Sequence, residues 1–350
     1  MRDSYNGIPV SCQVSFIIIF IHYIFSGNFG MTNKQKAPSP RDLAIEAAQV
    51  FMIFPSETFL APLEPYSDGE YPCAKSVASA AEGLHSVISA AGLPFQLIQE
   101  STMQRRFDRF HAAERILALI PEKPGSGLSE DSERRALKSA DQKMTEFLNN
   151  DEGSDIIRDQ IIFEMDRRLK SSTVRIAAQE LLVQTLISTW SIFESFARSF
   201  IIAWLNDDPS RASSIIASQD LKDFFGKKVV DLQTIGDHGF DLSKSMGTVL
   251  FKDRRLDSLG NIRGAMKAFF NSSNIQTALG KDLWILNQRR HLFVHNRGVV
   301  DLEYLKKSGD TAPLGERLTL KCADVEQHLV SVREAIIAVG DAAAATAKSV

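Results

Sequence analysis

Arginine and histidine side chains gather in one short stretch of the sequence, residues 281–309. Arg290 and His295 are separated there by four residues, within the segment RRHLFVHNRG. An arginine is always charged and offers a planar fork to phosphate oxygens. A histidine titrates near neutral pH and can move a proton. Cleavage of RNA by its own 2′-hydroxyl needs both functions, because a base must take the hydroxyl proton and a cation must stabilise the charge that builds on phosphorus. That chemistry requires no metal ion and no cofactor.

A helix expected over Asp282–Arg297 determines how these side chains are placed. Five residues along an ideal helix correspond to a rotation of about 140°, so the pair converges only if the long arginine reaches toward the histidine. His291 lies four residues before His295 and shares its face. Gly298 follows at the position where a glycine commonly ends a helix.

Other residues of the stretch are candidates for supporting roles. Arg289 and Arg297 add positive charge beside the pair, and Glu194, on an earlier helix, is a candidate to point toward the same site. A structural interpretation stands beside the catalytic one, in which Arg290 pairs with a carboxylate and His295 caps the helix. The apolar residues expected to be buried are Leu283, Trp284, Leu286, Phe293 and Val294.

The sequence around the pair resembles the ribonuclease-type branch of the HEPN superfamily, the higher-eukaryote and prokaryote nucleotide-binding helical domains. Members carry an arginine, four to six residues and then a histidine, usually with a polar residue directly after the arginine, as His291 stands here. The segment WSIFESFAR (190–198) resembles the family's first long helix, and LGNIRGAMKAFF (259–270) its middle segment. The resemblance covers about 173–339, half of the chain. The branch paired with nucleotidyltransferase antitoxins usually has a tyrosine where this chain has Arg297, so modification at that position is not supported.

The resemblance implies a helical bundle that forms a homodimer, in which two Arg–His pairs meet in one positively lined cleft. It implies a metal-independent endoribonuclease of a toxin–antitoxin, anti-phage defence or RNA-processing system. His295 would be the acid and base, Arg290 would bind the phosphate and the transition state, and His291 and Asn296 would orient. The expected partners are RNA, a second copy of the chain and an antitoxin or regulatory protein. The alternative is a catalytically inactive RNA- or protein-binding module of such a system.

The rest of the sequence predicts an all-α chain, because helical periodicity dominates and strand-like alternation is scarce. Ser39 and Pro40 predict a helix start, and the four prolines between 55 and 72 predict interruptions. The run 173–206 contains no Pro or Gly, which predicts one long helix or two nearly continuous ones. The other predicted helices are 41–54, 74–91, 98–120, 133–149, 155–171, 259–270 and 323–339.

These helices suggest a modular organisation. We expect an N-terminal helical region, a linker rich in Pro, Gly, Ser and acidic residues, connecting helices, a HEPN-like four-helix bundle and a fraying tail. The corresponding ranges are 31–120, 121–132, 133–172, 173–340 and 341–350.

Composition limits the compartment and the class of partner. The formal net charge is −3, which argues against a polybasic nucleic-acid-coating protein. Cys12, Cys73 and Cys322 are too few and too scattered for a disulfide framework or a zinc site, which favours a reducing compartment, the cytoplasm. Residues 14–25 are apolar but shorter than the roughly 20 residues of a membrane span. Three interpretations stay open for 1–30: an upstream extension that the functional protein lacks, a signal or anchor, and a buried structural segment.

Overall fold

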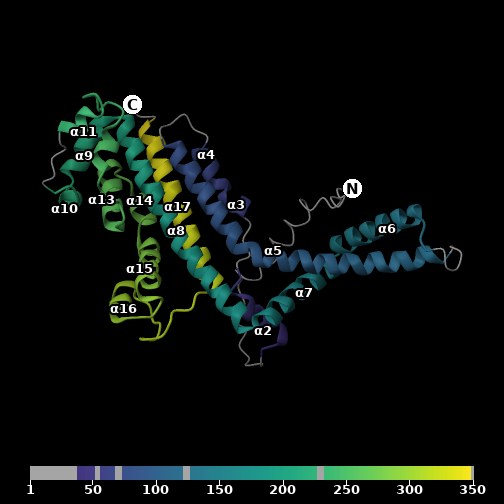
Figure 1. Ribbon diagram of the computed structural model, residues 1–350. Coiled ribbons are helices and arrows are strands. Elements are labelled where there is room, and N and C mark those ends of the chain that lie inside the picture. The colour runs from purple at the N-terminus through teal and green to yellow at the C-terminus, as the bar shows by residue number, and fades with distance from the viewer. Residues whose placement is uncertain (1–37, 52–55, 68–72, 121–126, 227–231, 348–350) are drawn as a thin grey trace. The chain divides into compact units, whose positions relative to one another are not determined.

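The computed structural model of the protein describes residues 38–51, 56–67, 73–120, 127–226 and 232–347. Within these ranges the chain is all-helical (Figure 1), with one isolated antiparallel bridge between Val299 and Arg317. The predicted all-α class is therefore confirmed. No helix in the described ranges is long and apolar enough to cross a membrane. The expectations for 1–30, including 14–25, and for much of the linker lie outside the described residues.

The chain divides into two compact units, and each unit is built from two separate segments. The first unit takes residues before position 56 together with Ala91–Gln179, and the second takes Ser56–Ala90 and Glu180–Val350. This division differs from the consecutive regions expected from the sequence. The reason is that two long helices, α5 (Ala74–Leu119) and α8 (Ser172–Asp207), each contribute residues to both units.

Helix α5 corrects one sequence prediction. Its range was expected to hold two helices, but a single helix of 46 residues runs through Pro94. A proline inside a helix removes one backbone hydrogen bond, here the bond that would reach the carbonyl of Ala90. The division between the units falls between Ala90 and Ala91, within one turn of that missing bond.

Short polar caps begin the helices of the first unit, and the cap at Ser39 was predicted. The Ser39 hydroxyl accepts a hydrogen bond from the Asp42 amide, the Asp42 carboxylate accepts one from the Ser39 amide, and Pro40 is the first helical residue. Asn150 likewise caps the helix that follows it. The helices are α2 (Pro40–Ala48), α6 (Glu130–Asn149) and α7 (Asp151–Leu169), so the first ends earlier than the predicted Phe54.

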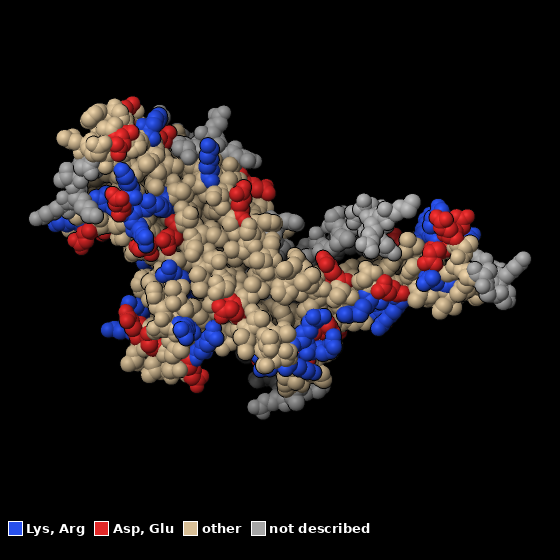
Figure 2. All heavy atoms as spheres, viewed as in Figure 1, with Lys and Arg blue, Asp and Glu red and all other residues tan. Residues whose placement is uncertain are grey.

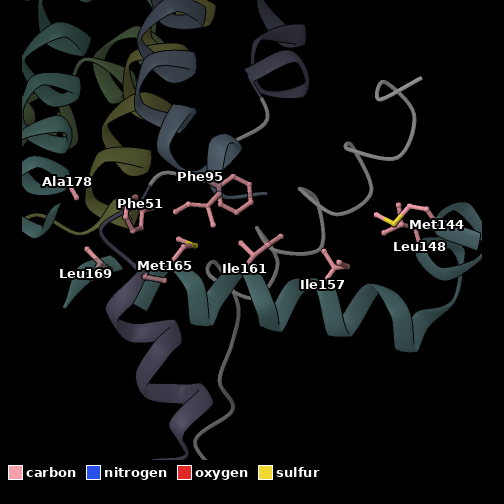
Figure 3. Packing of buried hydrophobic residues seen from close by; sticks show 11 residues of the cluster. Phe51, Phe95, Met144, Leu148, Ile157, Ile161, Met165, Leu169 and Ala178 are labelled. Atoms are coloured by element: carbon pink, nitrogen blue, oxygen red, sulfur yellow. The ribbon is translucent and has the colours of Figure 1, made fainter. Parts of the chain in front are cut away.

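One apolar cluster holds the first unit together. Phe51 and Phe95 pack with Ile157, Ile161 and Met165 along one side of α7 (Figure 3). Both isoleucines and the methionine are fully buried. Burying side chains of this size contributes about 1.5–3 kcal/mol each, which is how the helices of this unit are fixed against one another.

The core of the second unit is aromatic. Trp190, Phe193 and Phe200 of α8 are buried, and Trp204 packs against Phe270 with ring centroids 5.3 Å apart. The last helix, α17 (Cys322–Ala347), places Val325, Leu329, Val332, Ile336 and Val339 in the interior. Helix α17 extends eight residues beyond the predicted Val339, so the expected fraying of the tail is wrong up to Ala347. The four-helix bundle arrangement itself stays a prediction.

Shorter elements complete the second unit. Around Pro62 and Pro65 the helices are short, as predicted, giving α3 (Ser56–Leu60), η1 (Ala61–Leu63) and α4 (Glu64–Ser67). The other two prolines of this stretch lie outside the described residues. The Arg333 guanidinium of α17 donates to the Phe59 carbonyl at 3.1 Å, which ties these turns to the last helix. The remaining elements are η2 (Pro209–Arg211), α9 (Ala212–Ala217), η3 (Gln219–Leu221), α10 (Lys222–Phe225), α11 (Leu232–Gly236), α12 (Met246–Phe251), α13 (Leu259–Phe269), α14 (Ser273–Ala278), α15 (Lys281–Asn296) and α16 (Leu302–Ser308).

Candidate active site

Helix α15 carries the candidate residues and is fixed by its apolar face. Leu283, Leu286 and Phe293 are buried as predicted, and the helix packs against α16 and α17. Trp284 is only partly buried, and the Val294 side chain is 44% exposed. The predicted burial of Val294 is therefore wrong, since this position turns to solvent rather than to the neighbouring helices.

The predicted helix end is confirmed, with two residues in the left-handed region. Arg297 has φ +52° and Gly298 has φ +81°, and the Gly298 amide donates to the Leu292 carbonyl at 3.0 Å. A Cβ atom at Gly298 would lie 2.7 Å from the Phe293 ring. The glycine is therefore needed both for its backbone conformation and for space.

A groove of about 590 Å³ runs along α15, and we call it the Arg290 groove. Four of the predicted site residues line it together: Arg290, His291, His295 and Asn296. The arginine thus reaches the same groove as the histidine despite its offset of about 140° around the helix axis. The other lining residues are Asp257, Ser258, Leu259, Trp284, Asn287, Gln288, Leu292, Asp301, Glu303, Tyr304 and Lys307.

The two histidines of the groove lie against each other. The rings of His291 and His295 are stacked, with centroids 5.4 Å apart and an interplanar angle of 24°. Burial lowers the pKa of His291 below its usual 6.5, and the charges of Arg290 and of a protonated His295 lower it further. His291 is therefore neutral at pH 7 and can accept or donate one proton in a hydrogen bond.

Arg290 is a charged group without a protein partner. Within the described parts of the chain its guanidinium makes no hydrogen bond or ion pair, and its Nε is fully covered. The side chain is only partly buried and lines the groove, so its two Nη groups are available to an anion that enters the groove.

Acidic residues offset the cations of the groove. The Asn296 amide donates to Asp301, whose other oxygen caps α16 by accepting from the Tyr304 amide at 2.7 Å. Glu303 pairs with Lys307 at 2.6 Å. With Asp257 counted, three carboxylates face two permanent cations, so the groove of one chain is not positively lined. Figure 2 likewise shows Lys and Arg interspersed with Asp and Glu over α9–α16.

Arg289 points away from the Arg290 groove and has a structural role. Its Nη1 lies 3.2 Å from Asp324 and 3.1 Å from Nε2 of His328, both on α17, and its Nη2 lies 3.8 Å from Asp310. Asp310 also accepts from the Tyr304 hydroxyl at 2.7 Å. This network fixes α15 against α17, so Arg289 does not add its charge to the groove as predicted.

Two further predicted residues also lie outside the groove. Glu194 accepts a hydrogen bond from the Trp190 indole at 3.1 Å, one turn away on α8, and does not line the groove. Arg297 is exposed beyond the helix end and does not line it either. Trp284 was missed as a site residue. The helical spacing of Trp284, Asn287, His291 and His295 is the sequence signal that could have placed it on the same face.

The described residues hold no group of three or more His, Cys, Asp or Glu side chains placed to bind a metal ion. Cys73 and Cys322 are free and buried. No protein-family model, no curated protein and no solved structure matches the chain. The interpretation of the Arg290 groove therefore rests on its own geometry and on the resemblance of its sequence.

Proposed function

We propose that the protein is a metal-independent endoribonuclease of the HEPN type and that the Arg290 groove is its active site. The observation that carries the proposal is that an unpaired guanidinium and two imidazoles line one groove. A cation for phosphate and a group that transfers protons are the two requirements for RNA cleavage by the 2′-hydroxyl.

In the proposed reaction the 2′-oxygen of RNA attacks the adjacent phosphorus and the bond to the 5′-oxygen breaks. His295 accepts the 2′-hydroxyl proton and later returns a proton to the leaving 5′-oxygen. Arg290 binds the phosphate oxygens and stabilises the negative charge of the transition state. His291, neutral at pH 7, orients the substrate or His295, and Asn296 is held by Asp301 at the groove edge. The products are a 2′,3′-cyclic phosphate and a 5′-hydroxyl.

We further propose that two copies act together in the cytoplasm, with an antitoxin or regulatory protein as partner. The resemblance to the HEPN family supports a second copy. In such a dimer each chain would contribute its own Arg290 and His295 to a shared cleft.

The test is digestion of total RNA in EDTA by the full chain. We expect cleavage, and a loss of at least about 100-fold in rate for Arg290→Ala and for His295→Ala. Arg134→Ala and His85→Ala are matched controls, since both residues are exposed and lie on other helices. Circular dichroism should show equal helicity for all variants. Wild-type rates in both active-site variants would rule the proposal out.

A catalytically inactive binding module is the second candidate. Its supporting observation is the excess of carboxylates over permanent cations in the Arg290 groove, which suits a basic segment of a protein partner. In this case no RNA is cut under any condition, and growth of expressing cells is unaffected by His295→Ala.

A further inference from the structure

A second cavity shares Trp284 with the Arg290 groove, and it was not predicted from the sequence. It has a volume of about 760 Å³ and is lined by α13, α14 and the start of α15. We call it the Trp284 cavity, after the residue that lines both it and the Arg290 groove. Both volumes fall in the range of sites that hold small-molecule-sized groups.

Trp284 is suited to stacking on a ligand. Its indole N–H donates to the Lys307 carbonyl at 2.8 Å, which fixes the ring where the two cavities meet. Trp190 and Trp204 are fully buried, so Trp284 is the tryptophan that solvent and ligands reach. An indole face binds any nucleobase, because every base has a π-face.

The Trp284 cavity also carries cations that a phosphate can engage. Lys281 is exposed and makes no ion pair within the described residues. Lys267 pairs with Asp220 at 2.9 Å, but both side chains are at least half exposed, so the pair is weak and exchangeable. Gln276 adds an exposed amide that can donate to and accept from a base edge.

Arg263 has a different role at the same cavity. Its guanidinium donates to the carbonyls of Leu279 and Gly280, with 2.7 Å to the latter. These bonds hold the turn between α14 and α15, and so hold Lys281 and Trp284 at the mouth of the cavity. Arg263 therefore shapes the cavity, but its guanidinium already donates to two carbonyls and is not free to make a bidentate contact with a phosphate.

We infer that the Trp284 cavity is a nucleotide subsite continuous with the Arg290 groove, and that the substrate is single-stranded RNA several nucleotides long. One base stacks on Trp284, and a phosphate outside the reacting one contacts Lys281 and Lys267. A paired duplex is excluded, because its bases already stack on one another and cannot turn onto an indole. The inference rests on the proposed function of the Arg290 groove and adds the class and length of the substrate.

Binding of RNA that cannot be cleaved tests the inference separately from catalysis. Fluorescein-labelled, 2′-O-methylated oligouridylates of two and six nucleotides are titrated with the full chain, and anisotropy gives both affinities. We expect the hexamer to bind at least about tenfold more tightly than the dinucleotide, because stacking of one base adds that much. Lys281→Gln, which does not line the Arg290 groove, should remove most of this preference and leave dinucleotide affinity within about twofold. Trp284→Leu should also remove most of the preference.

Lys306→Gln is the matched control, since Lys306 is exposed on α16 and lines neither cavity. Equal affinities for the two lengths, no binding of either, or an equal effect of Lys306→Gln and Lys281→Gln would overturn the inference. Length-dependent binding without cleavage of natural RNA would support the subsite and refute the ribonuclease. Cleavage that depends on His295, in the absence of length-dependent binding, would support the ribonuclease and refute the subsite.

Discussion

Arg289 and Arg290 are neighbours in the sequence with opposite environments. Arg289 is held by Asp324, His328 and Asp310, whereas the Arg290 guanidinium has no partner in the described structure. A rotation of about 100° between successive residues of a helix is enough to separate the two sites. Both arginines were predicted to belong to one basic patch, because the sequence alone does not show which of two neighbouring residues faces a carboxylate.

The buried histidine of this network makes stability depend on pH. Burial and the charge of Arg289 lower the pKa of His328 to about 3 from its usual 6.5. Arginine only donates, so Nε2 of His328 must accept and the ring is neutral. Below pH 6.5 the unfolded chain binds a proton that the folded chain does not, so stability falls as the pH falls, by about 1.4 kcal/mol per unit.

We therefore expect His328→Gln to flatten the pH dependence of unfolding. Between pH 6.5 and pH 5 the wild type should lose about 2 kcal/mol more than the variant. Urea unfolding followed by circular dichroism at the two pH values measures this difference. His85→Gln, at an exposed position of α5, is the control and should keep the wild-type dependence. An unchanged slope in His328→Gln would show that this histidine is not the group responsible.

At the scale of the element, the positions of helices were predicted well and their lengths and continuity less well. The cap at Ser39, the helical run over 173–206 and the glycine stop of α15 all rest on local chemistry, and all three were correct. The break expected between the helices 74–91 and 98–120 is wrong, because the one backbone hydrogen bond lost at Pro94 does not end a helix that tertiary packing supports. Four of the candidate residues line one groove, and the sequence could group them because a single helix carries them all. The same helix carries Trp284, whose position was overlooked. The carboxylates of Asp301 and Glu303 reach the groove through tertiary packing, which the sequence does not indicate.

The glycine that ends α15 should be needed for the stability of the protein. We expect Gly298→Ala to destabilise the protein by about 1–3 kcal/mol, because alanine disfavours φ +81° and its Cβ would meet the Phe293 ring at 2.7 Å. Gly309→Ala at the end of α16 is the control, with φ +70° but no atom within 4 Å of the added Cβ. Thermal unfolding should rank Gly298→Ala well below Gly309→Ala. Equal losses would mean that backbone strain alone acts at both positions.

The division of the whole molecule into two units was beyond sequence reasoning. Each unit takes one part of α5 and one part of α8, and a continuous helix has the same periodicity on both sides of a boundary. The proposed RNA site lies wholly in the second unit, with every lining residue of both cavities between Asp220 and Lys307. The first unit is therefore not needed for the proposed contacts with RNA.

The charge of the whole molecule sets how RNA binding should respond to salt. The chain has a formal net charge of −3, and the two cavities together present at most five permanent cations: Arg263, Lys267, Lys281, Arg290 and Lys307. Each phosphate neutralised on a single strand contributes about −0.7 to the slope of log K against log salt concentration, so the slope should be no steeper than about −3.5. Anisotropy titrations of the 2′-O-methyl hexamer from about 50 to about 400 mM salt measure it. Lys281→Gln should make the slope shallower by about 0.7. A wild-type slope near −6 would require cations beyond these five, from a second copy or from the arginines of α5 in the first unit, and replacing those arginines would distinguish the two sources.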